Sequence, residues 1–239
     1  GFASEFLSND LELAVELTGD ALVRSNFSER TFEVEREGQL AQIAEEDDDV
    51  VDFGRRALRE QFFGDYPLRD EALGREESVR ALDLAALEAH RRRLVCPENL
   101  VIAVSGDFEP ERVRALLEAA LGGMSPSAFQ PRGSAYPGPA TGKREEIERE
   151  REQAIVHMGY PDVGVTHGRF HEAELLDEIF SGMSSRLFAR VREEKGMAYF
   201  VASSRIIGVH SGLFYLFAGT SPELAEAVLE EMRGEVARI

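Results

Sequence analysis

The chain has 239 residues, of which 27 are Lys or Arg and 45 are Asp or Glu, so its formal charge is −18. This charge repels nucleic-acid phosphates and anionic lipids, which excludes both as expected partners. Hydrophobic residues make up 43% of the chain, enough for a sizeable core, and no apolar run approaches the ~20 residues of a membrane span. The single cysteine, Cys96, excludes an internal disulfide and a multi-cysteine zinc site.

The first half of the chain predicts mainly helices, because apolar residues recur at helical spacing behind capping residues. Helices are expected over residues 7–22, 28–45, 51–62, 76–93 and 110–122. The acidic run 45–49 is expected to be solvated. Residues 99–107 are a short apolar run bounded by turn residues, which predicts a buried strand.

The second half alternates strands and helices. A Pro- and Gly-rich linker over residues 125–141 comes first. The expected elements that follow are a strand over 153–160, helices over 171–180 and 184–194, a hairpin of strands 197–207 and 212–219, and a helix from Pro222.

The histidines offer one candidate zinc site. His167 and His171 are four residues apart and are followed by Glu172 and Glu174, so one helical face could present two imidazoles and a carboxylate. The alternative is that the helix begins after His167, which would leave that imidazole outside the site. A serine or cysteine nucleophile has no supporting motif.

The most informative segment is residues 182–199. Ser184 is expected to cap a short helix that Gly196 ends, which places Arg192 at the end of one element and Tyr199 at the start of the next. Both side chains could then donate hydrogen bonds into one cleft. The competing interpretation is that Arg192 pairs with a neighbouring glutamate and that Tyr199 packs in the sheet.

This segment resembles the second-domain motif of the insulinase, pitrilysin and mitochondrial processing peptidase family of zinc metalloendopeptidases. The matching stretches are Ser-Arg-Leu-Phe at 185–188, Arg-Glu at 192–193, Gly-Met-Ala-Tyr at 196–199 and Ala-Gly-Thr at 218–220. Upstream, the family's order of a glycine-marked loop, a helix and a strand ending in Gly-Asp is met at 63–67, 74–79 and 99–107.

The resemblance implies an α+β fold with mixed, largely antiparallel sheets covered by helices. It implies that residues 1–124 are the latter part of one family domain, that 125–141 is a linker, and that 142–239 begin a second domain. Family members use an Arg and a Tyr seven residues apart to hold substrate, which assigns substrate binding to Arg192 and Tyr199. The chain is then a fragment of a longer bacterial parent.

The zinc chemistry of the family is missing from this chain. The motif His-x-x-Glu-His occurs nowhere, and of the family's two glutamates seven residues apart only Glu35 is matched, because the second position is Gln42. A neutral amide is a poor zinc ligand compared with a carboxylate. We therefore expect no catalytic residue, no metal ligand and no cofactor in this chain, with zinc belonging to the full-length parent or to a partner.

The resulting hypothesis is a metal-free half or partner subunit that closes a chamber and binds extended peptide or unfolded protein. Its expected partner is the second half or another subunit of the same family. One alternative is a fragment of an active zinc metalloendopeptidase whose metal motif lies upstream. A second is a non-catalytic scaffold resembling the core subunits of respiratory complexes. The chain is expected to be soluble, in a bacterial cytoplasm or periplasm.

Overall fold

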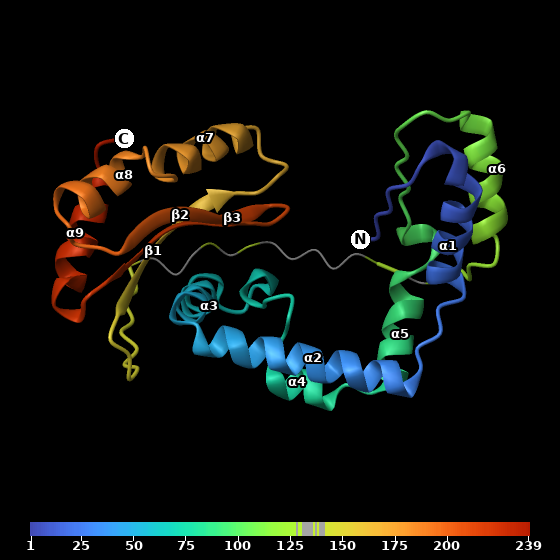
Figure 1. Cartoon of the computed structure of the whole chain (residues 1–239), viewed down its shortest axis with the longest axis horizontal. Helices are drawn as coiled ribbons and strands as arrows, with labels where there is room; N and C mark the ends of the chain where they lie inside the picture. Colours follow the sequence, from blue (N-terminus) through green and yellow to red (C-terminus); the bar gives the residue numbers. More distant parts are fainter. Residues whose placement is uncertain (128, 131–135, 137, 139–141) are drawn as a thin grey trace. The chain divides into compact units, whose positions relative to one another are not determined.

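The structure is a computed structural model that describes residues 1–127, 129–130, 136, 138 and 142–239 (Figure 1). Much of the predicted linker, namely residues 128, 131–135, 137 and 139–141, lies outside the described residues. The chain divides into two compact units, one formed by Gly1–Leu40 with Glu76–Gly133 and the other by Ala41–Arg75 with Ser134–Ile239.

The first unit is built from helices. They are α1 (Leu11–Val23), the first part of α2 (Glu29–Asp48), α4 (Glu76–Ala81), α5 (Leu84–Leu94) and α6 (Pro110–Leu121). Leu11 and Val15 of α1 pack on Val113 of α6 and form a small core. Gly19 lets the two helices approach closely, because a Cβ atom there would lie 2.9 Å from that of Ala120.

The single helix predicted over residues 76–93 is wrong, because the chain breaks between α4 and α5. Asp83 has an extended backbone, and its carboxylate accepts a hydrogen bond of 2.7 Å from the Ala86 N–H group. An aspartate in this position satisfies a free N–H group at a helix start, which favours a new helix over continuation of the old one.

The buried strand predicted over residues 99–107 is also wrong. Residues 100–107 have no regular secondary structure, and Val101, Ile102 and Val104 are 93%, 44% and 40% exposed. A strand is stable only when a neighbouring strand pairs with it. Within the part of the chain that the structure describes, no strand pairs with this segment, so its apolar composition is not matched by burial.

The second unit contains a three-stranded antiparallel sheet in the order β1-β3-β2. Its strands are β1 (Ala154–Val163), β2 (Phe200–Ile207) and β3 (Ser211–Thr220). The predicted hairpin of β2 and β3 is confirmed, and β1 extends three residues beyond its predicted end. Helices and an antiparallel sheet together confirm the predicted α+β class.

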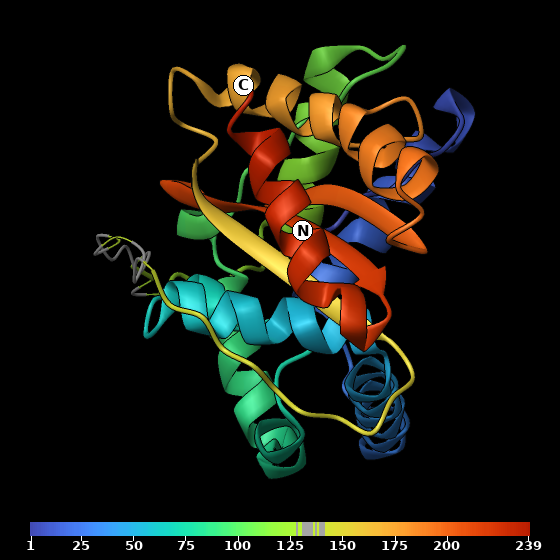
Figure 2. The same cartoon turned by 90° about the vertical axis from the view of Figure 1, so that its left-hand side faces the viewer.

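Alternate residues of β3 face two different layers of helix. Leu216 and its neighbours on one face join a core with residues of α7 (Phe170–Phe180), α8 (Arg186–Phe188) and α9 (Ala225–Val236). Leu213 and Tyr215 face α3 (Val50–Phe63) on the other side. Figure 2 views the sheet from the α9 side. The sheet is therefore covered on both faces, and its edges are left for pairing.

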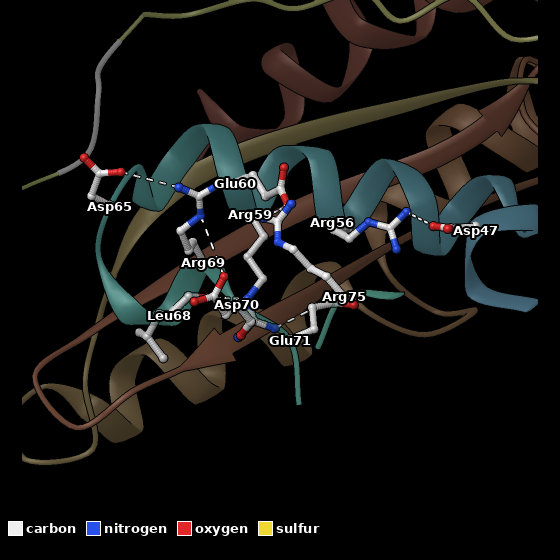
Figure 3. A network of polar contacts seen from close by, with 10 residues as sticks. All are labelled: Asp47, Arg56, Arg59, Glu60, Asp65, Leu68, Arg69, Asp70, Glu71 and Arg75. Carbon is white, nitrogen blue, oxygen red and sulfur yellow. Dashed lines mark hydrogen bonds and ion pairs between the residues drawn. The ribbon is translucent and has the colours of Figure 1, made fainter. Parts of the chain in front are cut away.

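Arginines of α3 hold the turn that follows the helix (Figure 3). Arg59 donates hydrogen bonds to the Leu68 and Asp70 carbonyl oxygens, the latter at 2.8 Å, and burial lowers the pKa of its guanidinium. Arg56 forms an ion pair with Asp47. The acidic run 45–49, which the sequence predicts to be solvated, therefore has one carboxylate, that of Asp47, in an ion pair with α3.

Candidate functional site

The segment from Gly182 to Tyr199 folds as two short helical pieces and a sharp turn. Gly182 has a φ of +77°, and the Ser185 hydroxyl then accepts a hydrogen bond of 3.1 Å from the Phe188 N–H group, which starts α8. The prediction named Ser184 as the cap, one residue too early. A π-helix, η4 (Ala189–Glu194), follows directly, and Gly196 ends it with a φ of +60°.

Buried contacts hold this segment in place. Leu187 and Val191 are completely buried in the core under the sheet. Glu235 of α9 is 3% exposed and accepts charge-assisted hydrogen bonds from Arg186 at 2.9 Å and from Arg238 at 2.6 Å. Removing one partner of a buried charge is costly, so these contacts fix the turn against α9.

Arg192 extends from η4 with its side chain 44% exposed. Its guanidinium carbon lies 4.8 Å from the centroid of the Phe188 ring, and the nearest carboxylate oxygen, on Glu193, is 4.0 Å from its Nε atom. Among the described residues, no acceptor lies within hydrogen-bond distance of the guanidinium. The ion pair with a neighbouring glutamate that the competing interpretation expects is therefore present, with Glu193, but it leaves the guanidinium donors without a hydrogen bond in the described structure.

Tyr199 stands immediately before β2 and is 59% exposed. Its N–H group donates a hydrogen bond of 2.8 Å to the Gly219 carbonyl, so its backbone already belongs to the sheet while its side chain leaves it. Arg192 and Tyr199 lie on the two sides of one turn, which is closed by a hydrogen bond of 3.1 Å from the Gly196 N–H group to the Arg192 carbonyl. No hydrogen bond joins the two side chains in the described structure.

The turn leads directly into an open sheet edge. In the described chain, β2 pairs with β3 alone, so the N–H and C=O groups along its other side are free for an added strand. The far end of β2 is fixed by Arg205, whose Nε atom lies 2.6 Å from the Asp162 carboxylate, with both side chains about 5% exposed or less. The edge is therefore rigid at both ends.

The residues around Gln42 do not fit a zinc ion. Gln42 lines a pocket of about 300 Å³ together with Leu73 and four acidic side chains, Glu45, Glu46, Asp49 and Asp52. Burial and the nearby Glu71 raise the pKa of Glu46, which favours its protonated form. Carboxylates can bind zinc, but a zinc site needs several ligands arranged around one point, and no three His, Cys, Asp or Glu residues of the described chain are placed to hold a metal ion.

The histidine pair singled out in the sequence does not form a site. His167 precedes α7 and accepts a hydrogen bond from the Arg169 N–H group at 3.1 Å, whereas His171 lies on the helix 2.6 Å from Glu174. Since one imidazole is outside the helix, they do not share a helical face, and the zinc interpretation of this pair is wrong.

In the described chain, every helix is too short or too polar for a bilayer crossing.

Comparison with known proteins shows the family of the chain. A model of the peptidase M16 inactive domain matches residues 81–239. The chain belongs to the M16 peptidase family. An uncharacterized zinc protease of Streptomyces coelicolor is 33% identical over 245 residues, which are all of this chain and 53% of that protein. One from Mycobacterium tuberculosis is 31% identical over 230 residues, 93% and 52% of the two chains.

Solved M16 structures share the fold. The M16 inactive domain from Pseudomonas fluorescens superposes with a TM-score of 0.82 at 20% identity and covers 97% of this chain and 56% of that one. The family predicted from the motif at residues 185–199 is confirmed. The present chain spans about half the length of the curated M16 relatives it matches.

Proposed function

We propose that this M16 chain is a metal-free half that binds an extended peptide beside the edge of β2, held by Arg192 and Tyr199. The observation that carries the proposal is the state of these two side chains. Both are exposed on a turn that buried contacts hold in place, and the Arg192 guanidinium, which has a 4.0 Å ion pair with Glu193, makes no hydrogen bond among the described residues. A preorganised donor costs less entropy on binding than a mobile one.

The chemistry of the site favours a peptide in strand conformation. Free backbone groups along β2 can pair with the backbone of any peptide, which gives affinity with little sequence selectivity. Arg192 and Tyr199 can each donate to a carbonyl or carboxylate oxygen of the peptide. The net charge of −18 favours peptides that carry Lys and Arg.

The experiment measures binding of a fluorescein-labelled, unstructured, Lys- and Arg-containing peptide of about ten residues by fluorescence anisotropy. Losing a hydrogen bond to a charged donor costs about 1.5–3 kcal/mol, so Arg192→Ala should weaken binding roughly ten- to a hundredfold. Tyr199→Phe should weaken it less. Arg233→Ala removes an exposed charge on α9 and should leave affinity unchanged. Equal affinity of Arg192→Ala and the unmodified chain would refute the proposal.

A second candidate function concerns the parent protein. The curated M16 relatives are called zinc proteases and are about twice as long as this chain, which favours an active parent whose zinc ligands lie outside these 239 residues. In that case the full-length protein should cleave the same peptide in a chelator-sensitive way. A parent that neither binds nor cleaves peptide would favour the scaffold alternative.

A further inference from the structure

The ring of Phe188 lies directly against the guanidinium of Arg192. The two residues are four apart across the start of η4, and the guanidinium carbon is 4.8 Å from the ring centroid. This distance is within the range of an attractive cation–π contact. A π-helix is uncommon and often marks a functional position, and here it begins immediately after Phe188.

Phe188 is held far more firmly than Arg192. Its N–H group is bound by the Ser185 hydroxyl, and its half-buried ring packs against the main core of the second unit. Arg192 has a long side chain with many rotamers and is 44% exposed. The Phe188 ring therefore offers a fixed face against which the flexible Arg192 guanidinium can pack.

The neighbouring acids are already engaged by other cations. Glu194 accepts a hydrogen bond of 2.8 Å from Arg190, and Glu231 is bound by Lys195, a contact that lowers the pKa of the Glu231 carboxyl. Among the described carboxylates, Glu193 is the one paired with Arg192, at 4.0 Å from its Nε atom. The Phe188 ring packs on the core and is a second contact of the guanidinium beside Glu193. Stacking on a ring face leaves the N–H groups free to donate at the guanidinium edge.

We infer that Phe188 is a positioning residue that holds the Arg192 guanidinium ready for a peptide oxygen. The inference rests on the proposed peptide-binding function. Phe188 itself touches no ligand in this scheme and acts through Arg192 alone. It follows that its contribution disappears when Arg192 is absent and scales with the electron density of the ring.

The test uses the labelled basic peptide and a double-mutant cycle. Phe188→Leu keeps an apolar side chain but removes the ring, and we expect peptide affinity to fall roughly two- to fivefold. Phe188→Tyr should restore it. In the Arg192→Ala background, Phe188→Leu should cause no further loss. Thermal unfolding of each variant checks that the fold is kept.

Phenylalanine analogues carrying one, two or three fluorines at position 188 supply a readout that packing does not move. Fluorination withdraws electron density from the ring while its shape is nearly kept, so affinity should fall stepwise with each fluorine. This series also replaces Phe188→Leu if that variant does not fold.

The outcomes separate the two proposals. If Arg192→Ala leaves peptide affinity unchanged, peptide binding at this site is refuted, and the role of Phe188 falls with it. If Arg192→Ala weakens binding but the fluorinated series is flat, or if Phe188→Leu costs the same in both backgrounds, peptide binding stands and the positioning role is refuted.

Discussion

His157 makes the stability of the second unit depend on pH. It lies on β1 and its ring stacks on Phe217, with centroids 6.0 Å apart and planes at 16°. Both ring nitrogens are buried. Gly54 of α3 makes room for the ring, because a Cβ atom there would lie 2.5 Å from the His157 Nε2 atom. The imidazole is therefore held neutral between a helix and the sheet.

Burial, together with the charge of Arg55, lowers the pKa of His157 from 6.5 to about 4. Between these values the unfolded chain binds a proton that the folded chain does not. The contribution to the free energy of unfolding is therefore complete above about pH 6.5 and is lost as the pH falls towards 4. Each pH unit between the two pKa values is worth about 1.4 kcal/mol, so a pKa lowered by about 2.5 corresponds to about 3 kcal/mol in the free energy of unfolding.

The assay is urea unfolding followed by circular dichroism from about pH 7.5 to about pH 4 at constant ionic strength. His157→Phe is the matched control, because it keeps a flat ring and removes the titrating group. Subtracting the two free energies cancels the titration of the acidic residues. The unmodified chain should lose about 3 kcal/mol relative to the variant across this range. A difference that does not change with pH, or an NMR pKa near 6.5 for His157, would refute the reasoning.

Three further predictions concern buried contacts and the metal. Asp162→Ala should lower the free energy of unfolding by about 3 kcal/mol or more, because it strands the buried Arg205; a urea measurement showing under about 1 kcal/mol contradicts this. Gly164→Ala should lower the free energy of unfolding by about 2 kcal/mol, because a Cβ atom there would lie 2.4 Å from the Val209 carbonyl oxygen. Gly168→Ala is the control, because no atom lies within 4 Å of its Cβ position, and it should leave the free energy of unfolding nearly unchanged. After chelator treatment and zinc addition, metal analysis should find far less than one zinc per chain, and the melting temperature should not change.

The sequence predicts the second unit better than the first. The hairpin of β2 and β3 has a local signal, because two apolar runs lie on either side of a short turn. The apolar run at 99–107 carries the same kind of local signal, yet pairing depends on a neighbouring strand, which local composition cannot supply. Asp83, which begins a new helix within residues 76–93, is a typical capping residue. Helical periodicity on both sides of it nevertheless favours one continuous helix, so the break was not predicted.

The candidate site was partly predictable. The substrate-binding role of Arg192 and Tyr199 comes from the resemblance to the family motif, and this assignment stays a prediction until binding is measured. Local reasoning left both side chains open to a purely structural role. Phe188 belongs to the matched motif at 185–188, but its contact with Arg192 was not predicted, because that contact depends on the π-helical backbone of η4, which no residue pattern indicates. The ion pair between Arg186 and Glu235 joins residues 49 positions apart and could not be predicted from neighbouring residues.

The apolar side chains displayed between residues 100 and 104 limit the conditions under which the chain can be kept dispersed. A charge of −18 makes copies repel one another, but this repulsion reaches only about 10 Å at 0.1 M salt and shortens as salt is added. Attraction between apolar surfaces is not screened in this way. Self-association of the chain should therefore increase with ionic strength, and buffers with little salt should keep the copies apart.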